Sequence, residues 1–287
     1  MGPLAGRKYA TCLLLSLFVL APLHSQQPQI PGETAPSLFS QAAVKILQRQ
    51  ETSSDISYLL LDASSGAVLA THWQNPLQPV PMGSLVKPFT ALAYAGEHDF
   101  RYPIYECRGK VSGCWQDQPH GKLDITTAVS LSCNAYFRRM AESVSSEQLM
   151  EVTRDFGLEF PRAHFTSANL IGLGEQWPIS PLHMARAYLE LYRRKEQPGV
   201  LPILEGMRQS ALRGTGAAVD RQLRHSAALV KTGTAPCTHS PWAPTDGFVL
   251  VLVPAEQPEI LLLIRIHSVA GARAAETAGR WLRQMEE

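Results

Sequence analysis

The sequence predicts an α+β fold, in which strands from both ends of the chain form one antiparallel sheet and helices lie between them. Two observations support this prediction. Strand-like apolar runs occur near the start and again in the last quarter, whereas the middle carries apolar residues at helical spacing. Strands at both ends of a chain that flank a run of helices favour one sheet with an inserted helical lobe.

The elements follow in order along the chain. Apolar spacing predicts helices over residues 37–49, a stretch starting after Gly83, 124–144, 181–194 and 270–285. Ser180 is a natural cap for the fourth of these. Strand-like runs cover residues 56–61, 67–73, 227–234, 248–253 and 260–266, and the first two flank a turn at 62–66.

The N-terminus is typical of an export signal. Arg7 and Lys8 precede an apolar run over residues 12–20, which is short for a membrane span. We expect a signal peptide over residues 1–25, with Ser25 at the last removed position. Leu23 is larger than this site prefers, so an uncleaved membrane anchor remains the alternative. A Pro/Gln-rich linker, residues 26–36, then leads to a single domain over 37–287, placed in the periplasm or on the outer face of the cytoplasmic membrane.

Charge bears on whether nucleic acid is a partner, and the cysteines bear on whether the chain holds a disulfide or a metal. Lys and Arg total 26 against 25 Asp and Glu, so nucleic acid is not an expected partner. In an oxidising compartment, a disulfide between Cys107 and Cys114 is the favoured interpretation. The alternative makes these two cysteines and His120 metal ligands, but no fourth ligand stands at zinc-site spacing. We therefore expect no metal and no cofactor.

The central stretch of the chain contains a Ser-x-x-Lys motif, Ser84-Leu85-Val86-Lys87, before an apolar helical run. Residues at i and i+3 of a helix are neighbours. A serine hydroxyl needs an adjacent base to act as a nucleophile, and a lysine is such a base only when its pKa falls toward about 7. Burial and a second nearby cation can lower that pKa.

Two further motifs can complete such a site. Ser132 and Asn134 stand two residues apart, so they can bracket a lysine and pass a proton. A second Ser-x-Asn at 167–169 is interpreted as a chance match. Lys231-Thr232-Gly233-Thr234 ends a strand, where Gly233 lets a substrate backbone approach and backbone N–H groups can face an oxyanion.

These motifs, in this order, resemble the signature of penicillin-binding proteins and serine β-lactamases. The resemblance extends to several stretches that look like transpeptidase domains, and it runs from about residue 56 to the C-terminus. The stretches that carry it are Pro88-Phe89, Pro119-His120-Gly121-Lys122-Leu123-Asp124, residues 171–174, 178–185 and 205–208, and Gly214-Thr215-Gly216.

The resemblance implies a β-lactamase/transpeptidase-like fold and a D,D-transpeptidase or D,D-carboxypeptidase that acts on peptidoglycan stem peptides and is acylated by β-lactams. It makes Ser84 the nucleophile and Lys87 its base, with Ser132 and Asn134 relaying the proton and orienting the substrate. Lys231 is the second cation. Thr232, Gly233 and Thr234 hold the substrate carboxylate and line the oxyanion site.

Two other classes stay open. The compact size is closer to class D β-lactamases, although their second motif usually ends in Val rather than Asn. A non-catalytic penicillin-binding sensor or scaffold is the other alternative. The tryptophans Trp115, Trp177 and Trp242 are interpreted as packing residues, with Trp242 as the candidate for an aromatic at the groove rim.

Overall fold

The computed structural model describes residues 2, 37–50, 53–160 and 165–287. The predicted signal segment and linker therefore lie outside the described residues, apart from Gly2. Within the described residues, no helix combines the length and the hydropathy needed to cross a membrane.

A five-stranded antiparallel sheet organises the domain, and its strands come from both ends of the chain as predicted. The strand order is β2-β1-β9-β8-β7. The bounds of these strands are Ile56–Asp62 for β1, Val68–Thr71 for β2, Leu229–Pro236 for β7, Thr245–Val253 for β8 and Ile260–His267 for β9.

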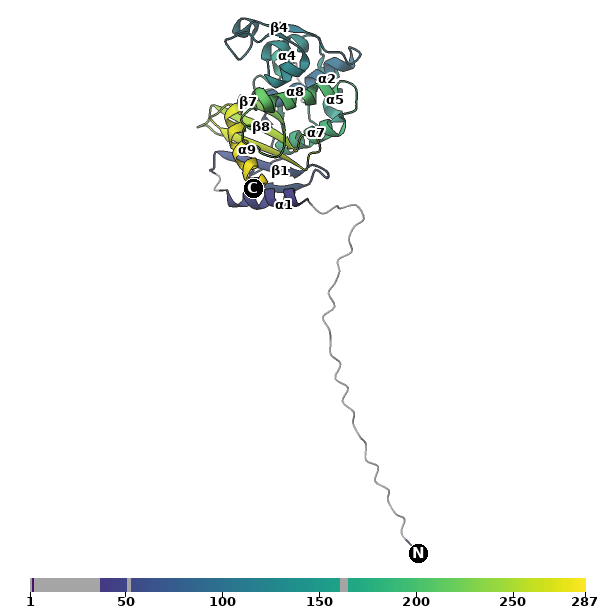
Figure 1. Ribbon diagram of the computed structural model, residues 1–287. Coiled ribbons are helices and arrows are strands. Elements are labelled where there is room, and N and C mark those ends of the chain that lie inside the picture. Colours follow the sequence, from purple (N-terminus) through teal and green to yellow (C-terminus); the bar gives the residue numbers. More distant parts are fainter. Residues whose placement is uncertain (1, 3–36, 51–52, 161–164) are drawn as a thin grey trace. The chain divides into compact units, whose positions relative to one another are not determined.

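The two faces of the sheet are both buried. Leu262 and Ile264 of β9 belong to a core shared with helices α1 (Leu38–Arg49) and α9 (Gly271–Glu286), whereas Leu261 and Leu263 belong to the core of the helical lobe. This alternation is the period of two expected of a strand, here with apolar residues on both sides. Figure 1 shows α1 and α9 beside the sheet.

The helical lobe is inserted between β2 and β7. Its elements are β3 (Val80–Pro81), η1 (Gly83–Val86), α2 (Lys87–Gly96), β4 (Tyr105–Cys107), η2 (Gly109–Ser112), β5 (Gly121–Leu123), α3 (Ile125–Ser130), α4 (Asn134–Ala141), α5 (Ser146–Asp155), α6 (Ser167–Leu170), β6 (Pro178–Ile179), α7 (Pro181–Arg193) and α8 (Val200–Arg213). Figure 1 shows α7 alongside the sheet, and α2, α4, α5 and α8 gathered above it. The side chain of Ser180 accepts a hydrogen bond from the N–H of His183 and caps α7 as predicted.

The prediction of one helix over residues 124–144 is wrong, because the chain breaks between α3 and α4. Ser132 has a φ of +49°, a left-handed conformation that no helix can propagate. Both halves bury their apolar side chains in the same core, so the helical spacing of apolar residues continues across the break. Neither Gly nor Pro marks it in the sequence.

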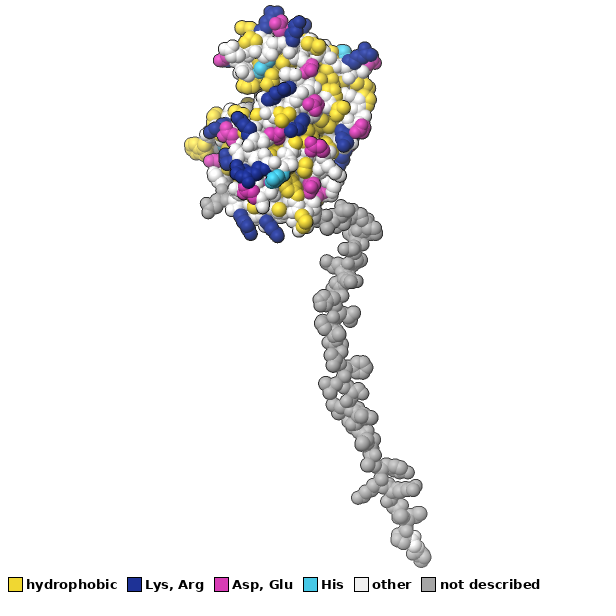
Figure 2. Space-filling model, viewed as in Figure 1, with side chains coloured by type: hydrophobic (Ala, Val, Ile, Leu, Met, Phe, Trp, Pro, Cys, Tyr) yellow, Lys and Arg dark blue, Asp and Glu magenta, His cyan; other side chains and the backbone are white. Residues whose placement is uncertain are grey.

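The charged side chains are mixed over the surface. In the view of Figure 2, basic and acidic groups are interspersed on the domain, with no large area of a single sign. This distribution agrees with a net charge of +1, and the face in view carries no basic stripe of the kind typical of nucleic-acid-binding proteins.

Candidate active site

Ser84 lies in the 3-10 turn η1, which continues directly into α2. Gly83 has a φ of +58°, and a Cβ atom there would lie 2.2 Å from the carbonyl oxygen of Thr234. Gly172 is packed as tightly, since its Cβ would lie 2.1 Å from the carbonyl oxygen of Gly83. Only glycine permits such backbone contacts, so two glycines hold Ser84 against the end of β7.

Lys87 is fully buried beneath this turn. Its Nζ donates hydrogen bonds of 2.6 Å to Asn134 Oδ1 and 2.8 Å to the carbonyl oxygen of Ser132, and lies 3.5 Å from Ser132 Oγ. These three acceptors match the three N–H groups of an ammonium. A neutral amine would keep two donors for the two carbonyl oxygens and present its lone pair to a hydroxyl.

The break between α3 and α4 places Ser132 and Asn134 around Lys87. An unbroken helix would put residues two apart on different faces, whereas here the carbonyl and hydroxyl of Ser132 and the amide of Asn134 all face the same Nζ. The predicted bracket is therefore present, and the left-handed turn at Ser132 produces it.

Lys231 approaches the same hydroxyl from the sheet. Its Nζ donates to Ser132 Oγ at 2.9 Å and to the carbonyl oxygen of Thr232 at 2.7 Å, and its side chain is fully buried. The three motifs therefore meet at one atom, Ser132 Oγ, which stands between the two lysines.

Burial has the largest effect on both lysines, because a low-dielectric interior disfavours the charged form. It lowers the pKa of Lys87 to about 7, although the neighbouring cysteines Cys133 and Cys114 act in the opposite direction. Burial, and then repulsion by Lys87, lowers the pKa of Lys231 well below its usual value. The prediction that a second cation lowers the pKa of Lys87 needs correction, because burial is the main cause there.

No hydrogen bond joins Ser84 Oγ to another side chain within the described residues. Lys87 is held instead by Ser132 and Asn134. Ser84 lines the pocket together with Ser132 and Asn134, the two residues that hold Lys87, whereas the fully buried Lys87 does not line it. The hydrogen bond between Ser84 and Lys87 expected from the i, i+3 spacing is therefore not formed in this structure.

The Lys-Thr-Gly strand forms the opposite wall of the pocket. Thr232 Oγ1 donates to Thr215 Oγ1 at 2.6 Å, and Thr234 Oγ1 accepts from the backbone N–H of Gly271 at 3.0 Å. A Cβ on Gly233 would lie 2.5 Å from the carbonyl oxygen of Met82. Gly233 therefore also serves the close packing of β7 against the segment that enters η1.

The pocket has a volume of about 360 Å³ and contains most of the predicted site residues. Thr215, Leu173 and residues 270–272 line it as well, and the motifs did not single these out for the site. Trp115 also lines it and is half exposed, with its indole N–H 3.3 Å from the carbonyl oxygen of Leu131. The rim aromatic is thus Trp115, whereas Trp242 does not line the pocket.

The predicted disulfide between Cys107 and Cys114 is not formed, since both are free thiols in this structure. They share a buried cluster with two further ligand-type side chains, whose donor atoms all lie within 4.8 Å of one another. This inner thiol cluster consists of Cys107, Cys114, His120 and Cys133. Burial opposes ionisation of Cys107, yet the backbone N–H groups of His120 and Gly109 bring the pKa of its thiol below the ordinary value.

Cys133 supplies the fourth donor that the spacing of the sequence did not reveal. It is the N-cap residue of α4, whereas the other three members lie in the segment from β4 to β5. Three thiols and one imidazole form a donor set that can hold zinc in a tetrahedral site. Cys133 stands between Ser132 and Asn134, so the cluster anchors the segment that brackets Lys87.

The sequence model of the penicillin-binding protein transpeptidase domain matches residues 56–283. The chain belongs to this family. The match covers the sheet, the helical lobe and all three motifs of the transpeptidase domain. No curated protein matches the chain.

Solved structures show the same fold. PBP2 from Pseudomonas aeruginosa, in complex with WCK 5153, aligns with a TM-score of 0.68 and 17% identity over 86% of this chain and 76% of its own. PBP2 from Helicobacter pylori, in complex with MreC, gives 0.65 and 15% over 86% and 62%. The D,D-transpeptidase domain of a peptidoglycan glycosyltransferase from Eggerthella lenta gives 0.62 and 16% over 86% and 81%. At these identities the likeness shows the fold of the transpeptidase domain.

Proposed function

We propose that this domain is a serine D,D-transpeptidase or D,D-carboxypeptidase that forms an acyl-enzyme on Ser84 with D-Ala-D-Ala stem peptides and with β-lactams. The convergence of Lys87 and Lys231 on Ser132 Oγ carries the proposal, because it joins two buried amines to a hydroxyl that lines the same pocket as Ser84. Ser84 lines this pocket and supplies the hydroxyl of the Ser-x-x-Lys motif.

In the proposed acylation step, the neutral amine of Lys87 removes the proton of Ser84 Oγ as that oxygen attacks the substrate carbonyl. The backbone N–H groups of Ser84 and Thr234 stabilise the oxyanion that forms. Ser132 Oγ gives its proton to the leaving amine and regains one from the lysine ammonium, so no net proton is consumed. An acceptor amine or water then releases the acyl group from Ser84.

The carboxylate of the terminal D-Ala is assigned to the wall formed by Thr232 and Thr234, with the ammonium of the fully buried Lys231 on the same strand. Thr232 Oγ1 donates its proton to Thr215 Oγ1 in this structure, so the Thr232 hydroxyl would have to exchange that partner in order to donate to the carboxylate. Trp115 and Leu173 give this pocket an apolar side, which suits the aliphatic part of a stem peptide.

Labelling with a fluorescent penicillin tests the nucleophile. We expect a covalent adduct on the wild type and none on Ser84→Ala. Ser143→Ala, a matched change of an exposed serine, should label like the wild type. An adduct of unchanged intensity on Ser84→Ala would overturn the assignment.

Intact-mass spectrometry over time with benzylpenicillin distinguishes the classes. A long-lived adduct, together with release of D-Ala from a pentapeptide stem, is expected for the proposed enzyme. Fast loss of the adduct with turnover of nitrocefin would indicate a class D-like β-lactamase. A stable adduct without any reaction of the pentapeptide would indicate a penicillin-binding sensor or scaffold.

The substrate and the β-lactams would meet the domain outside the cytoplasm, in the periplasm or at the outer face of the membrane.

A further inference from the structure

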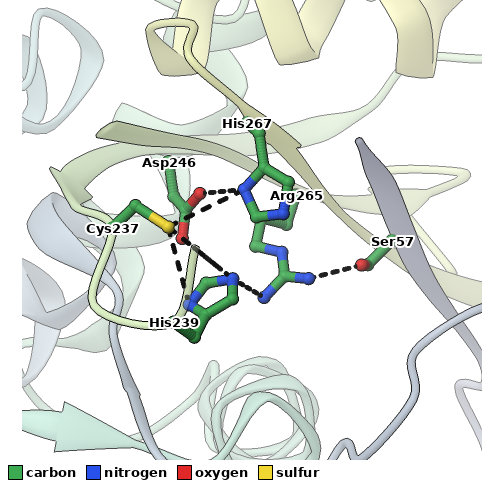
Figure 3. Close-up of polar contacts among 6 residues, drawn as sticks. All are labelled: Ser57, Cys237, His239, Asp246, Arg265 and His267. Atoms are coloured by element: carbon green, nitrogen blue, oxygen red, sulfur yellow. Dashed lines mark hydrogen bonds and ion pairs between the residues drawn. The ribbon is translucent and has the colours of Figure 1, made fainter. Parts of the chain in front are cut away.

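A second cluster of ligand-type side chains lies at the end of the sheet, outside the lining of the pocket. Its members come from the β7–β8 connection, from β8 and from the end of β9, and their donor atoms all lie within 4.8 Å of one another. This hairpin cluster consists of Cys237, His239, Asp246 and His267. Figure 3 shows the thiol, the carboxylate and the two imidazoles directed toward one another.

The antiparallel register brings these residues together. Asp246 of β8 pairs directly with His267 of β9, which places both side chains on the same face of the sheet. Cys237 follows the end of β7, and its backbone N–H bonds the carbonyl oxygen of Pro244 across the connection. The fold therefore supplies two members from paired strands and two from the adjoining loop.

The separations suit a small tetrahedral ion. Cys237 Sγ lies 3.8 Å from His239 Nε2 and 3.9 Å from His267 Nδ1, and His239 Nε2 lies 3.7 Å from Asp246 Oδ2. Zinc bonded to sulfur and nitrogen at its usual lengths gives edges of about 3.5 Å between such donors. The pair His267 Nδ1 and Asp246 Oδ1, at 2.6 Å, is closer, because these two atoms share a hydrogen bond.

A catalytic Cys-His-Asp relay does not fit this geometry. Such a relay needs one ring nitrogen on the thiol and the other on the carboxylate. Here His267 directs the same atom, Nδ1, at both Cys237 and Asp246. His239 has Nδ1 3.7 Å from Cys237 Sγ and Nε2 3.7 Å from Asp246 Oδ2. That Nε2 lies 2.7 Å from Arg265 Nη1, so it does not bond the carboxylate. Convergence of thiol, imidazole and carboxylate on a common point is instead the arrangement of a metal site.

We propose that the hairpin cluster binds one divalent cation of the zinc class. One thiol, two imidazoles and one carboxylate are donors that zinc and cobalt prefer, whereas magnesium and calcium take oxygen ligands. On binding, the Cys237 thiol loses its proton to solvent, and His267 moves its ring proton from Nδ1 to Nε2. The four protein ligands complete the coordination, so the ion is structural and ties the β7–β8 connection to the end of β9.

Arg265 competes with the ion for one ligand. Its Nη1 donates to His239 Nε2 at 2.7 Å, and its Nη2 donates to Ser57 Oγ at 2.7 Å. Arginine only donates, so the lone pair of His239 Nε2 faces Arg265 until a metal takes it. The positive charge of the guanidinium also opposes a dication. Arg265→Gln is therefore expected to bind zinc more tightly, by about tenfold.

The test is a zinc titration of the reduced, metal-free full chain against a chromophoric chelator, repeated with cobalt for its thiolate absorption. Cys237→Ser is expected to lose one equivalent of metal, or to bind it at least about a hundredfold more weakly. Cys133→Ser removes a ligand of the inner thiol cluster instead, so the equivalent of metal at the hairpin cluster should remain bound. His225→Ala, a change of an exposed histidine outside both clusters, should bind like the wild type.

Hydrogen exchange on the wild type provides a readout that needs no variant. Zinc is expected to slow exchange over residues 237–246, which lie next to the strand that carries Thr234. Equal metal content in the wild type and Cys237→Ser would overturn the proposal. So would exchange over residues 237–246 that zinc leaves unchanged, in which case the cluster is a hydrogen-bonded network only.

Discussion

Lys231 Nζ donates a hydrogen bond of 2.9 Å to Ser132 Oγ, and this contact joins the sheet to the helical lobe inside the pocket. Ser132 Oγ also lies 3.5 Å from Lys87 Nζ, so one hydroxyl stands between two buried amines. Ser132 Oγ can therefore exchange a proton with either buried lysine without water. The proposed proton transfer depends on the protonation states of the two lysines. It also depends on the tight packing at glycines that holds Ser84 in place.

The rate of acylation should depend on the protonation of Lys87. Burial brings the pKa of this amine to about 7, and only the neutral form accepts the proton of Ser84. Below that pH the rate of acylation by benzylpenicillin should fall about tenfold per pH unit, and above it the rate should level off. Stopped-flow measurement with a fluorescent penicillin gives the profile. A rate that stays flat across this range would exclude Lys87 as the base.

Asn134→Asp should move that profile to higher pH. Asn134 Oδ1 is 2.6 Å from Lys87 Nζ, so the substitution places a carboxylate against the ammonium with little change in shape. A nearby anion favours the charged lysine and raises its pKa by about 1–3 units. The same acylation assay should show its inflection shifted upward by that amount. Asn134→Ala serves as the control, because it removes the contact without adding a charge.

The stability of the domain should rise with pH above neutrality. The pKa of Lys87 is about 7 in the folded state, against 10.5 for an unperturbed lysine side chain, so between these values the unfolded chain binds more protons. The free energy of unfolding should therefore increase from pH 7 toward pH 10, by at most roughly 5 kcal/mol from this residue. Urea unfolding of the wild type and Lys87→Met at several pH values measures it. Lys87→Met should show a shallower slope, and an identical slope would contradict the assignment.

Gly172→Ala should disrupt the site through packing. Its Cβ would lie 2.1 Å from the carbonyl oxygen of Gly83, and its φ is +79°. We expect the free energy of unfolding to fall by about 3 kcal/mol or more, with loss of penicillin labelling. Gly157→Ala is the matched control, since its φ is +67° with no atom within 4 Å of the added Cβ. That variant should lose only about 1 kcal/mol and keep its labelling.

The cysteines should react with a thiol reagent as free thiols. If Cys107 and Cys114 are free, as in this structure, a thiol reagent added to the denatured, unreduced full chain should modify all five cysteines of the sequence. A disulfide between them would leave two cysteines unmodified and would restore the original prediction. In the folded protein, a zinc chelator should speed modification of the inner thiol cluster if it holds a metal.

Much of the fold follows from local patterns. The cap at Ser180, the helix over α9 and the strands β7, β8 and β9 each lie where residue spacing predicted them, because their apolar residues repeat with the period of the element. The break between α3 and α4 does not show in that pattern. The apolar face of each half enters the same core, so tertiary packing decides where the helix stops and leaves Ser132 with a positive φ.

The sequence by itself determined which residues we propose for the chemistry: the three motifs point to Ser84, Lys87, Ser132, Asn134 and Lys231, and the family match covers all of them. The tertiary structure decided how deeply these side chains are buried and which distant residues lie beside one another. It buries Lys87, which lowers its pKa, and it brings Cys133 to Cys107, and His267 to Cys237, across large separations in the sequence. Spacing along a chain reports neighbours within one element. Burial and the meeting of distant segments depend on how those elements pack, so only the folded domain reveals them.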